Sequence, residues 1–562
     1  MTPFLIDNDN IYLKTIASGE MTGTPEPHMY YMGFLSGAVI SFFYRITGNG
    51  IPWFGIFLCL SLAIPMILML HRSLLVCEKV WSAIAVWGLY TICFCNFFYH
   101  YFAKTQYTVA TGFVGAGALF LLCMLSVKEN TRSFFLAAIP FFILSVCSFG
   151  MRDKGFLMLF PFLGMVFLEK LLEGEKRSQR RNVIGLGCLF LAVLLLPWAW
   201  NRAQYSSKAW KEFKAYTDAS EILFDYDGFP EYDSHQELYS ELGILRSSYE
   251  AITKHYNILM DPAVNRDTMV RLAEVAEKER LEEQAPFFMK LVQVLRDIVD
   301  VNLKQYQDRP LNILVFLLYF FVALLAMMGK KLGALREILF VVVARMFDWI
   351  YLVWYGRYPF RVTQIIYMAE LVMLVSILLK HKLWSIGKEK SKPGLAVFGT
   401  MCVLILLSGI RFGFPVMKGN YQHVKGIREL SVCFPELEEY LTSKRENFYY
   451  FDMSHLYYME DTLKFQSSPY ENYVYMGSWM PNSPWYREKM EHFGITDVAE
   501  ALLTNEHVFI LYQQVDFDTR DFLDDYFDEH YPGTELKVVD EFASSNGFHY
   551  EVLKPMRKSI KD

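Results

Sequence analysis

Long apolar segments recur along this chain of 562 residues, and they constrain its fold more than any other feature. Hydrophobic residues make up 53% of the sequence and are gathered in continuous runs rather than spread at helical or strand spacing. A helix that crosses a bilayer needs roughly 20 apolar residues. The sequence therefore predicts an α-helical polytopic membrane protein with ten spans, at residues 51–70, 79–98, 106–126, 133–149, 155–169, 182–199, 311–328, 336–354, 359–380 and 394–411.

Basic residues mark one side of this predicted bundle. They collect in the connectors at residues 71–79, 170–181, 330–331 and 380–392. Because short basic loops stay in the cytoplasm, the other hydrophilic regions are expected outside it. The predicted domains are an outer loop at 1–50, transmembrane sets at 51–199 and 311–411, an outer helical loop at 200–310, and an outer soluble domain at 412–562.

Residues 29–44 are also apolar, but a stretch of about 16 residues is short for a crossing. We predict that they form a helix lying along the outer leaflet. The N-terminus is then outside without a helix to carry it there, and residues 2–6 are typical of the last turn of a span. We therefore expect a first transmembrane helix encoded upstream, with Met1 internal to the full protein.

An acidic cluster precedes all of these segments. It lies in the run Ile6-Asp7-Asn8-Asp9-Asn10-Ile11-Tyr12, and Ala17 follows. The run Gly23-Thr24-Pro25-Glu26-Pro27-His28 then opens the apolar stretch at 29–45, ahead of the first predicted span. Carboxylates at the mouth of an apolar bundle are suitable catalytic bases for a membrane-embedded transferase.

This order of motifs resembles the GT-C fold glycosyltransferases of membranes, such as protein O-mannosyltransferases and aminoarabinose transferases. That superfamily carries Asp-(Asp/Glu)-x-Tyr and then Ala in its first outer loop, before a membrane-parallel helix opened by prolines and a basic or His residue. The resemblance covers about residues 1–411, with Asp9-Asn10-Ile11-Tyr12 in the motif. Asn10 departs from it, which leaves open whether Asp9 or Asp7 is the base.

The resemblance implies a multi-pass cell-membrane enzyme that transfers a sugar from a polyprenyl-phosphate carrier. The acceptor would be a glycan, a lipid or a protein on the outer face. Asp9 is the predicted base, with Asp7 as the alternative, and burial at the membrane mouth would raise the base's pKa toward neutrality. Both aspartates could instead cap a helix at 10–18, because Asp is a favoured cap.

Substrate-binding residues are predicted from the same resemblance and from charge. Tyr12 and His28 belong to the first outer loop. The turn at 354–361 resembles an Arg-Tyr turn that docks lipid phosphate, and arginine binds phosphate through its fork of donors. Its candidates are Arg357, Tyr358 and Arg361, which could alternatively anchor helix ends at the headgroups. Weaker candidates are Arg152, which Asp153 could neutralise, and Lys104.

Among the charged residues of the predicted spans, three stand out because charge inside a membrane is costly and usually paired. They are Arg345, Asp348 and Glu370. The spans that contain Arg345 and Glu370 form a hairpin, and both residues lie at a similar distance from its turn. We predict a buried structural ion pair between them.

No cofactor is predicted with certainty. The nine cysteines form no CxxC pair, which argues against a zinc site. A divalent cation remains an option for the acidic run at 516–528, although a solvated helix face explains that run better. The net charge of −6 argues against a nucleic-acid partner.

The two large hydrophilic regions are expected to differ in structure. Residues 201–308 read as helical, and 287–303 are amphipathic and expected to lie along the membrane. The C-terminal region is expected to be α/β or α+β, with strands at 447–451 and 507–512, a helix at 519–530 and a turn at 544–547 before the last strand. Trp479 lies in an expected exposed loop and is a candidate glycan contact.

Three other functions fit parts of the pattern. A flippase or transporter of lipid-linked sugars would show internal repeats, which the sequence lacks. A polysaccharide polymerase or ligase shares the lipid-linked donor but not the early acidic motif. An inactive scaffold on the same fold is supported mainly by Asn10.

Overall fold

The structure is a computed structural model of the chain. It describes residues 4–5, 8–255, 261–283, 286–304, 306–383, 392–430, 434–451, 460–463, 471–477, 479–480, 482–514, 520–545 and 547–558.

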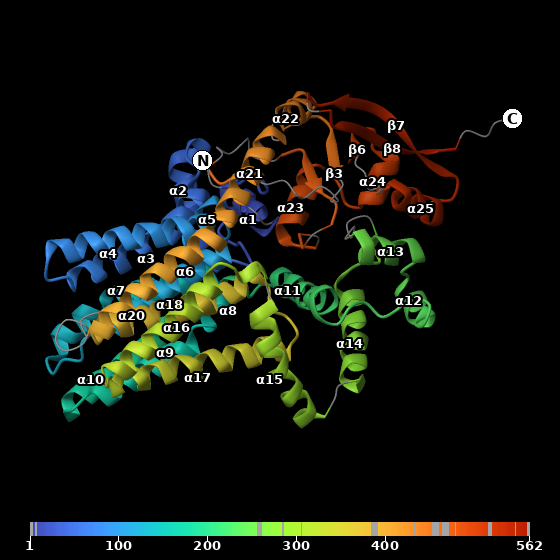
Figure 1. Ribbon diagram of the computed structural model, residues 1–562. Helices are drawn as coiled ribbons and strands as arrows, with labels where there is room; N and C mark the ends of the chain where they lie inside the picture. The colour runs from blue at the N-terminus through green and yellow to red at the C-terminus, as the bar shows by residue number, and fades with distance from the viewer. Residues whose placement is uncertain are drawn as a thin grey trace.

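A bundle of helices forms one end of the molecule, and outer helices and a β-sheet domain cover the other (Figure 1). The helices before residue 205 are α1 (Asn8–Ser18), α2 (Phe34–Thr47), α3 (Trp53–Leu75), α4 (Val80–Cys93), α5 (Tyr99–Ala103), α6 (Tyr107–Met124), α7 (Thr131–Met151), α8 (Asp153–Leu157), α9 (Phe160–Glu173) and α10 (Arg177–Gln204). The second part of the bundle contains α16 (Leu311–Met328), α17 (Leu332–Trp354), α18 (Phe360–Lys380), α20 (Lys392–Ser408) and α21 (Phe414–Leu430).

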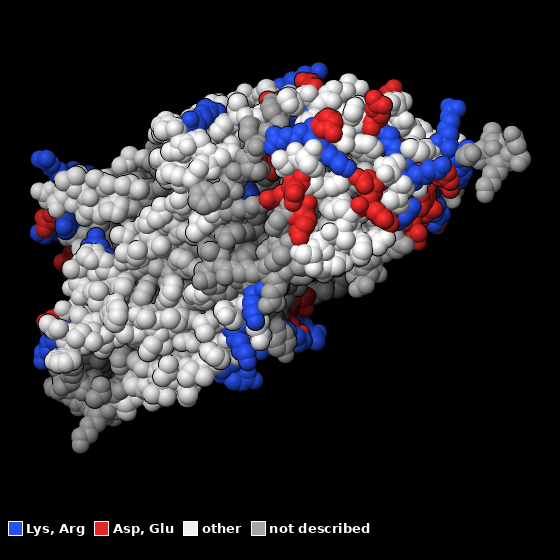
Figure 2. Space-filling model, turned by 90° about the horizontal axis from the view of Figure 1, so that it is seen from above, with Lys and Arg blue, Asp and Glu red and all other residues white. Residues whose placement is uncertain are grey.

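Within the described residues, eight helical segments are long and apolar enough to cross a membrane. They are Trp53–Leu75, Val80–Ala103, Tyr107–Met124, Thr131–Met151, Arg177–Gln204, Leu311–Met328, Phe360–Lys380 and Ala396–Gln422. The predicted polytopic helical fold is confirmed. Figure 2 shows the matching surface, with an uncharged band across the bundle between charged side chains at its far end and over the opposite half of the molecule.

The predicted count of ten spans is higher than these eight. The predicted span at 155–169 is divided between α8 and α9, and α9 has only 14 residues. The predicted span at 336–354 does form a helix, α17, of 23 residues. Helix α17 carries four charged residues, Arg336, Glu337, Arg345 and Asp348, and for this reason is not among the eight apolar segments above. Charged side chains of neighbouring helices pair with Arg336, Glu337 and Arg345.

Helices α6 and α18 lie at the centre of the bundle. The most apolar stretch of α6 is 94% buried inside the protein and that of α18 is 83% buried. The peripheral segment Val80–Ala103 is only 6% buried and therefore exposes its apolar side chains. The two central helices both begin at the end of the bundle that faces the helices between residues 208 and 304.

Two π-helical turns cross at the edge of the bundle. They are η2 (Phe94–Phe98), between α4 and α5, and η6 (Gly409–Gly413), between α20 and α21. Any side chain at Gly413 would collide with the carbonyl of Asn96, so glycine allows this close approach. The crossing fixes α5 beside α21, and π-turns inside helices frequently mark functional sites.

The region between α10 and α16, called the outer loop after its predicted side of the membrane, contains α11 (Lys208–Glu221), α12 (Gln236–Leu242), α13 (Arg246–His255), α14 (Arg266–Glu283) and α15 (Phe287–Lys304), with a π-turn η3 (Ile222–Tyr226) after α11. The helix expected at 287–303 is confirmed as α15. Its Phe287, Phe288 and Val292 are exposed. That surface is apolar, as the prediction of a helix lying along the membrane requires.

The C-terminal region contains a five-stranded mixed sheet in the order β5-β3-β6-β8-β7. The strands are β3 (Phe448–Phe451), β5 (Tyr473–Tyr475), β6 (Val508–Gln513), β7 (Thr534–Ala543) and β8 (His549–Arg557). β3 is parallel to β5 and β6, while β8 is antiparallel to β6 and β7. Helices α22 (Phe434–Ser443), α23 (Pro484–His492), α24 (Val498–Thr504) and α25 (Arg520–His530) accompany the sheet. The predicted α/β or α+β domain is confirmed.

A second, small sheet joins this region to the start of the chain. β1 (Phe4–Leu5) pairs in parallel with β2 (Lys104–Thr105) and antiparallel with β4 (Glu460–Asp461). The hydroxyl groups of Thr105 and Thr462 lie 2.7 Å apart and are buried. Gly55 of α3 contacts the Thr462 backbone so closely that a Cβ would collide with it. The C-terminal region is therefore built into the end of the bundle.

Candidate functional site

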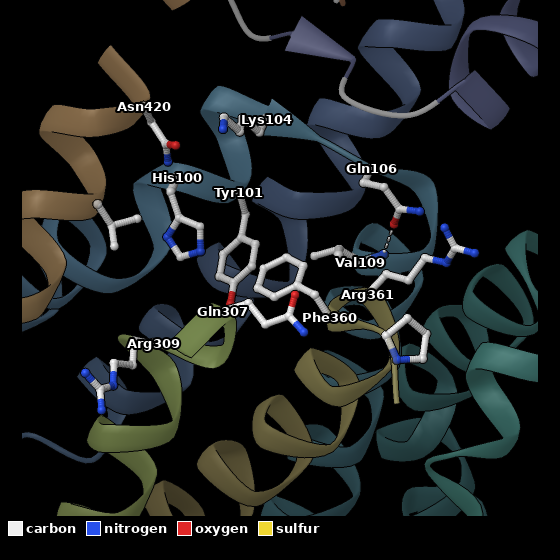
Figure 3. Close-up of a pocket in the computed structure, with 12 residues that line it drawn as sticks. His100, Tyr101, Lys104, Gln106, Val109, Gln307, Arg309, Phe360, Arg361 and Asn420 are labelled. Carbon is white, nitrogen blue, oxygen red and sulfur yellow. Dashed lines mark hydrogen bonds between the residues drawn. The ribbon is translucent and has the colours of Figure 1, made fainter. Parts of the chain in front are cut away.

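A cavity of about 500 Å³ lies where α5 ends and α6 and α18 begin. Figure 3 shows Lys104, Arg309 and Arg361 on three sides of the rings of Tyr101 and Phe360. The lining residues are His100, Tyr101, Lys104, Gln106, Val109, Gln307, Arg309, Pro359, Phe360, Arg361, Val416 and Asn420.

The lining carries positive charge. Lys104, Arg309 and Arg361 line the cavity, and none of its described lining residues is a carboxylate. Partial burial lowers the pKa of Lys104, which reports the cost of placing an ammonium group there without an anion. A phosphate in the cavity would offset that cost.

Two helix ends add to the same electrostatic field. Gln106 caps α6, and its side-chain oxygen accepts a hydrogen bond from the Val109 N–H at 2.8 Å. Pro359 precedes α18, whose first residues Phe360 and Arg361 line the cavity. Helix N-termini carry partial positive charge and bind anions. The cavity therefore has the properties of an anion site at the end of an apolar bundle.

Lys104 and Arg361 are the two predicted site residues that line this cavity. Arg357 instead contacts the outer loop, with its Nη2 2.7 Å from Asp225 and its Nη1 3.5 Å from Glu221. Burial raises the pKa of Asp225, and the charges of Arg357 and Arg361 oppose that rise. Asp225 therefore lies close enough to both arginines of the predicted turn for their charges to affect its pKa.

Arg152 contacts the first residues of α6. It donates hydrogen bonds to the Tyr107 hydroxyl and, at 2.6 Å, to Thr108 Oγ1, and its guanidinium group lies over the Tyr107 ring. The neighbouring Asp153 accepts a hydrogen bond from the Lys154 N–H at the start of α8. Arg152 thus orients the N-terminus of α6.

Asp9 lies half-buried in the first turn of α1. Burial raises the pKa of Tyr31 well above its ordinary value, and the nearby charge of Asp9 adds to that rise. Tyr107 and Glu221 act on the same Tyr31 hydroxyl. The charge of Asp9 therefore lies near enough to Tyr31 to act on its hydroxyl group. Asp7 lies outside the described residues.

Asn10 holds α1 against α6. It is fully buried, and its side-chain oxygen accepts a hydrogen bond from the Tyr107 N–H at 3.2 Å. The residue that departs from the family motif therefore has a structural contact of its own. This contact fixes the turn that carries Asp9 beside the start of a central helix.

Tyr12 is buried against the C-terminal region. Its ring makes edge contacts with Tyr475 and Trp479, at 6.1 and 5.6 Å between ring centroids. Trp479 also contacts the Tyr31 ring, at 4.7 Å. The prediction that Trp479 lies in an exposed loop is wrong, because these aromatic rings half-bury it. Sequence patterns gave no signal for a contact between residues so far apart in the chain.

His28 is held by the outer loop and does not line the cavity. It stacks on Trp210 at 5.3 Å, and its Nδ1 contacts the Glu26 carboxylate. Burial would raise the pKa of Glu26, but hydrogen bonds and charge from His28 bring it below its ordinary value. Tyr358 also lies outside the lining, one residue before Pro359.

Several lining residues were not predicted, above all Tyr101, Gln307 and Arg309. Arg309 lies two residues before α16, and Arg361 is the second residue of α18. A basic residue at the start of a span is the signal that could have found Arg309.

Together the bundle, the cationic cavity and the fused C-terminal sheet define a polytopic membrane protein with a candidate anion site. No protein-family model and no curated protein matches the sequence. Two crystal structures of ArnT from Cupriavidus metallidurans are similar, one bound to undecaprenyl phosphate and one in the apo state. Their TM-scores are 0.38 and 0.35, with 11% and 10% identity, over 98% of this chain and 94% of theirs. A likeness this distant does not by itself assign an activity.

Proposed function

We propose that the protein is a membrane glycosyltransferase that moves a sugar from a polyprenyl-phosphate carrier to an acceptor on the outer face of the membrane. The observation that supports this most strongly is the cavity. It presents three cations and two helix N-termini to a space of about 500 Å³ at the end of an apolar bundle. That volume lies within the range of small-molecule sites, about 300–1,000 Å³.

In this proposal Lys104, Arg309 and Arg361 bind the carrier phosphate. Donors placed around a leaving phosphate stabilise the charge that develops as the sugar–phosphate bond breaks. The carrier's isoprenoid chain would leave the cavity toward the lipid. The nearby segment Val80–Ala103 is a peripheral span, and only 6% of its most apolar stretch is buried inside the protein.

Asp9 is the proposed base, and Asp7 is the second candidate. The half-buried position of Asp9 near Tyr31 suits a carboxylate that removes a proton from an acceptor hydroxyl or amine. Tyr12 and Trp479 would border the acceptor on the side of the C-terminal region. The distribution of basic connectors supports placing this end of the molecule outside the cytoplasm.

A catalytic divalent cation has little support from the described residues. The group of carboxylates close enough to share an ion is Glu169, Glu173 and Glu337. Lys380 already contacts all three of these carboxylates. They also lie at the opposite end of α18 from the cavity.

The test is release of free carrier phosphate from a panel of polyprenyl-phosphate sugars by the full-length protein in membranes. Asp9→Asn is expected to reduce release by about 100-fold or more, the usual contribution of a general base. Asp153→Asn is the matched control, because Asp153 is exposed and outside the cavity lining, and it should leave release unchanged.

Release that persists in Asp9→Asn would move the base to Asp7 or elsewhere. Binding of the carrier without release for any sugar would contradict a transferase and favour a lipid-linked sugar flippase or an inactive scaffold. Absence of carrier binding would contradict the proposal as a whole.

A further inference from the structure

A chain of buried hydrogen bonds runs behind the cavity wall. Tyr101 lines the cavity (Figure 3), and its hydroxyl donates to the side-chain oxygen of Gln364. The Gln364 Nε2 group donates to Asp308 Oδ1 at 3.1 Å, and Thr363 Oγ1 donates to the same oxygen at 2.5 Å. Asp308 itself lies between the lining residues Gln307 and Arg309.

Burial makes this arrangement costly to break. Asp308 and Gln364 are each 1% exposed, and Tyr101 is 2% exposed. An unsatisfied polar group at such a position costs about 1–3 kcal/mol. The three side chains therefore hold their hydrogen bonds unless a ligand replaces one of them.

The direction of every bond in the chain follows from Asp308. An ionised carboxylate only accepts hydrogen bonds, so Gln364 must turn its NH₂ group toward Asp308. The carbonyl oxygen of Gln364 then faces Tyr101 and takes the single hydroxyl proton of that residue. The Tyr101 oxygen can therefore only accept a hydrogen bond from any further partner.

Tyr101 therefore differs in chemistry from the three cations of the lining. The side chains of Lys104, Arg309 and Arg361 have donor groups but no acceptor atoms, which suits them to the phosphate of the carrier. A phosphodiester has no O–H group to give to Tyr101. A ligand group with an O–H or N–H bond does, and the Tyr101 ring lies nearly parallel to that of Phe360, at 21° and 6.4 Å, as an apolar wall for a sugar face.

We propose that Tyr101 accepts a hydrogen bond from a hydroxyl or amino group of the transferred sugar, with Gln364 and Asp308 as the positioning residues that fix this polarity. The inference rests on the proposed function and deepens it. It divides the cavity into a phosphate-binding part made of cations and a sugar-reading part made of Tyr101. Tyr101 is accordingly a specificity-determining residue.

The experiment measures binding by the full-length protein in nanodiscs. The three probes are undecaprenyl phosphate without sugar, with a neutral hexose and with an amino sugar. Tyr101→Phe removes only the hydroxyl group, and Gln364→Met removes the polar link at nearly constant shape. Tyr90→Phe is the matched control, since the Tyr90 hydroxyl donates to the Met66 carbonyl on α3, outside the cavity lining.

Tyr101→Phe is expected to weaken binding of a sugar-bearing carrier about fivefold, the effect of one hydrogen bond, and to leave undecaprenyl phosphate within twofold. Gln364→Met should have the same selective effect. The two substitutions together should be no worse than either alone, because they break one chain. Whether the hexose or the amino sugar shows the loss tells whether a hydroxyl or an amine is read.

Equal weakening of all three probes, or of none, would overturn the inference that Tyr101 reads the sugar, without contradicting the proposed phosphate site. Additive effects of the two substitutions would overturn the role of Gln364. Failure of the wild-type protein to bind undecaprenyl phosphate would instead overturn the proposed function together with this inference. Thermal unfolding of each variant, compared with Tyr90→Phe, separates these outcomes from a loss of folding.

Discussion

The two ends of helix α18 carry cations in opposite surroundings. Arg361, at the start, lines a cavity of about 500 Å³, whereas Lys380, at the end, borders one of only about 20 Å³. The 19 helical steps from Arg361 to Lys380 span about 28 Å, close to the thickness of a bilayer core. One helix therefore joins an open cationic site to a closed cluster of charges.

The closed cluster contains nearly equal numbers of acids and bases. Lys380 lies 2.9 Å from Glu337 and 4.0 Å from Glu169, and it also contacts Glu173. Arg336 donates two hydrogen bonds to Glu169, at 3.0 and 2.7 Å. Charges matched in this way fill their own space and tie α9, α17 and α18 together. The described lining of the cavity, in contrast, holds three cations and no carboxylate, which favours an anionic ligand.

The largest expected effect comes from breaking a buried pair between these two ends. The predicted ion pair of Arg345 and Glu370 is confirmed, and Glu370 is fully buried. Arg345→Met should reduce the free energy of unfolding by about 3–5 kcal/mol, because Glu370 is left as an uncompensated charge. Thermal unfolding in detergent measures this. The double variant Arg345→Met/Glu370→Leu should recover most of the loss, and a double variant as unstable as the single one would contradict the account.

The next effect concerns the open site. Lys104→Ala combined with Arg361→Ala should weaken binding of undecaprenyl phosphate by more than about 100-fold, since each charge-assisted hydrogen bond contributes about 1.5–3 kcal/mol. The melting temperature should stay close to that of the wild type. A large fall in stability with unchanged affinity would mean that these cations are structural, like Lys380.

Lys380→Met should destabilise the protein by about 2 kcal/mol, because it leaves three carboxylates close together without their shared cation. Carrier binding at the other end should not change. Lys382→Met is the control, since Lys382 forms an exposed pair with Glu78 and exposed pairs contribute about 0–1 kcal/mol. Equal effects of the two substitutions would argue against a closed cluster.

Asp308 provides the smallest effect and a test by pH. Burial raises its pKa from 3.8 to about 6, although hydrogen bonds from Thr363 and Gln364 oppose the rise. The raised pKa means that the folded state binds this proton more tightly than the unfolded state. Its contribution to stability is therefore full below about pH 3.8 and is lost as the pH rises through 6.

Asp308→Asn should remove the loss of stability that occurs as the pH rises. The variant is expected to be more stable than the wild type by about 1–2 kcal/mol at pH 8, and equally stable at pH 4. Thermal unfolding of both proteins across this range is the measurement. Parallel stability profiles would show that Asp308 does not titrate there.

The sequence predicted the parts of this comparison that depend on local pattern. Apolar runs predicted the spans. The resemblance of the turn at 354–361 to a phosphate-docking turn suggested Arg361, and the charged stretch between two predicted spans suggested Lys104. Arg345 and Glu370 were paired correctly because a hairpin brings residues at equal distances from its turn together. The helix of 287–303 and the strands at 447–451 and 507–512 also followed from local spacing.

The rest depends on contacts between distant segments. Arg357 was predicted to bind phosphate, yet it pairs with Asp225 and Glu221 of the outer loop, more than 130 residues earlier. The contact of Trp479 with Tyr31 joins the C-terminal region to the N-terminal region of the chain. Tyr101 has no distinguishing pattern, because its role comes from Gln364 and Asp308 on other elements.

The central claim is that the cations at the start of α18 and around it bind a carrier phosphate. The most direct test is a cryo-EM structure of the full-length protein in nanodiscs with undecaprenyl phosphate. The account predicts phosphate density inside the cavity, within hydrogen-bonding distance of Lys104 and Arg361. Phosphate density beside Arg357 and Glu221, or at the Lys380 cluster, with the cavity empty, would contradict it.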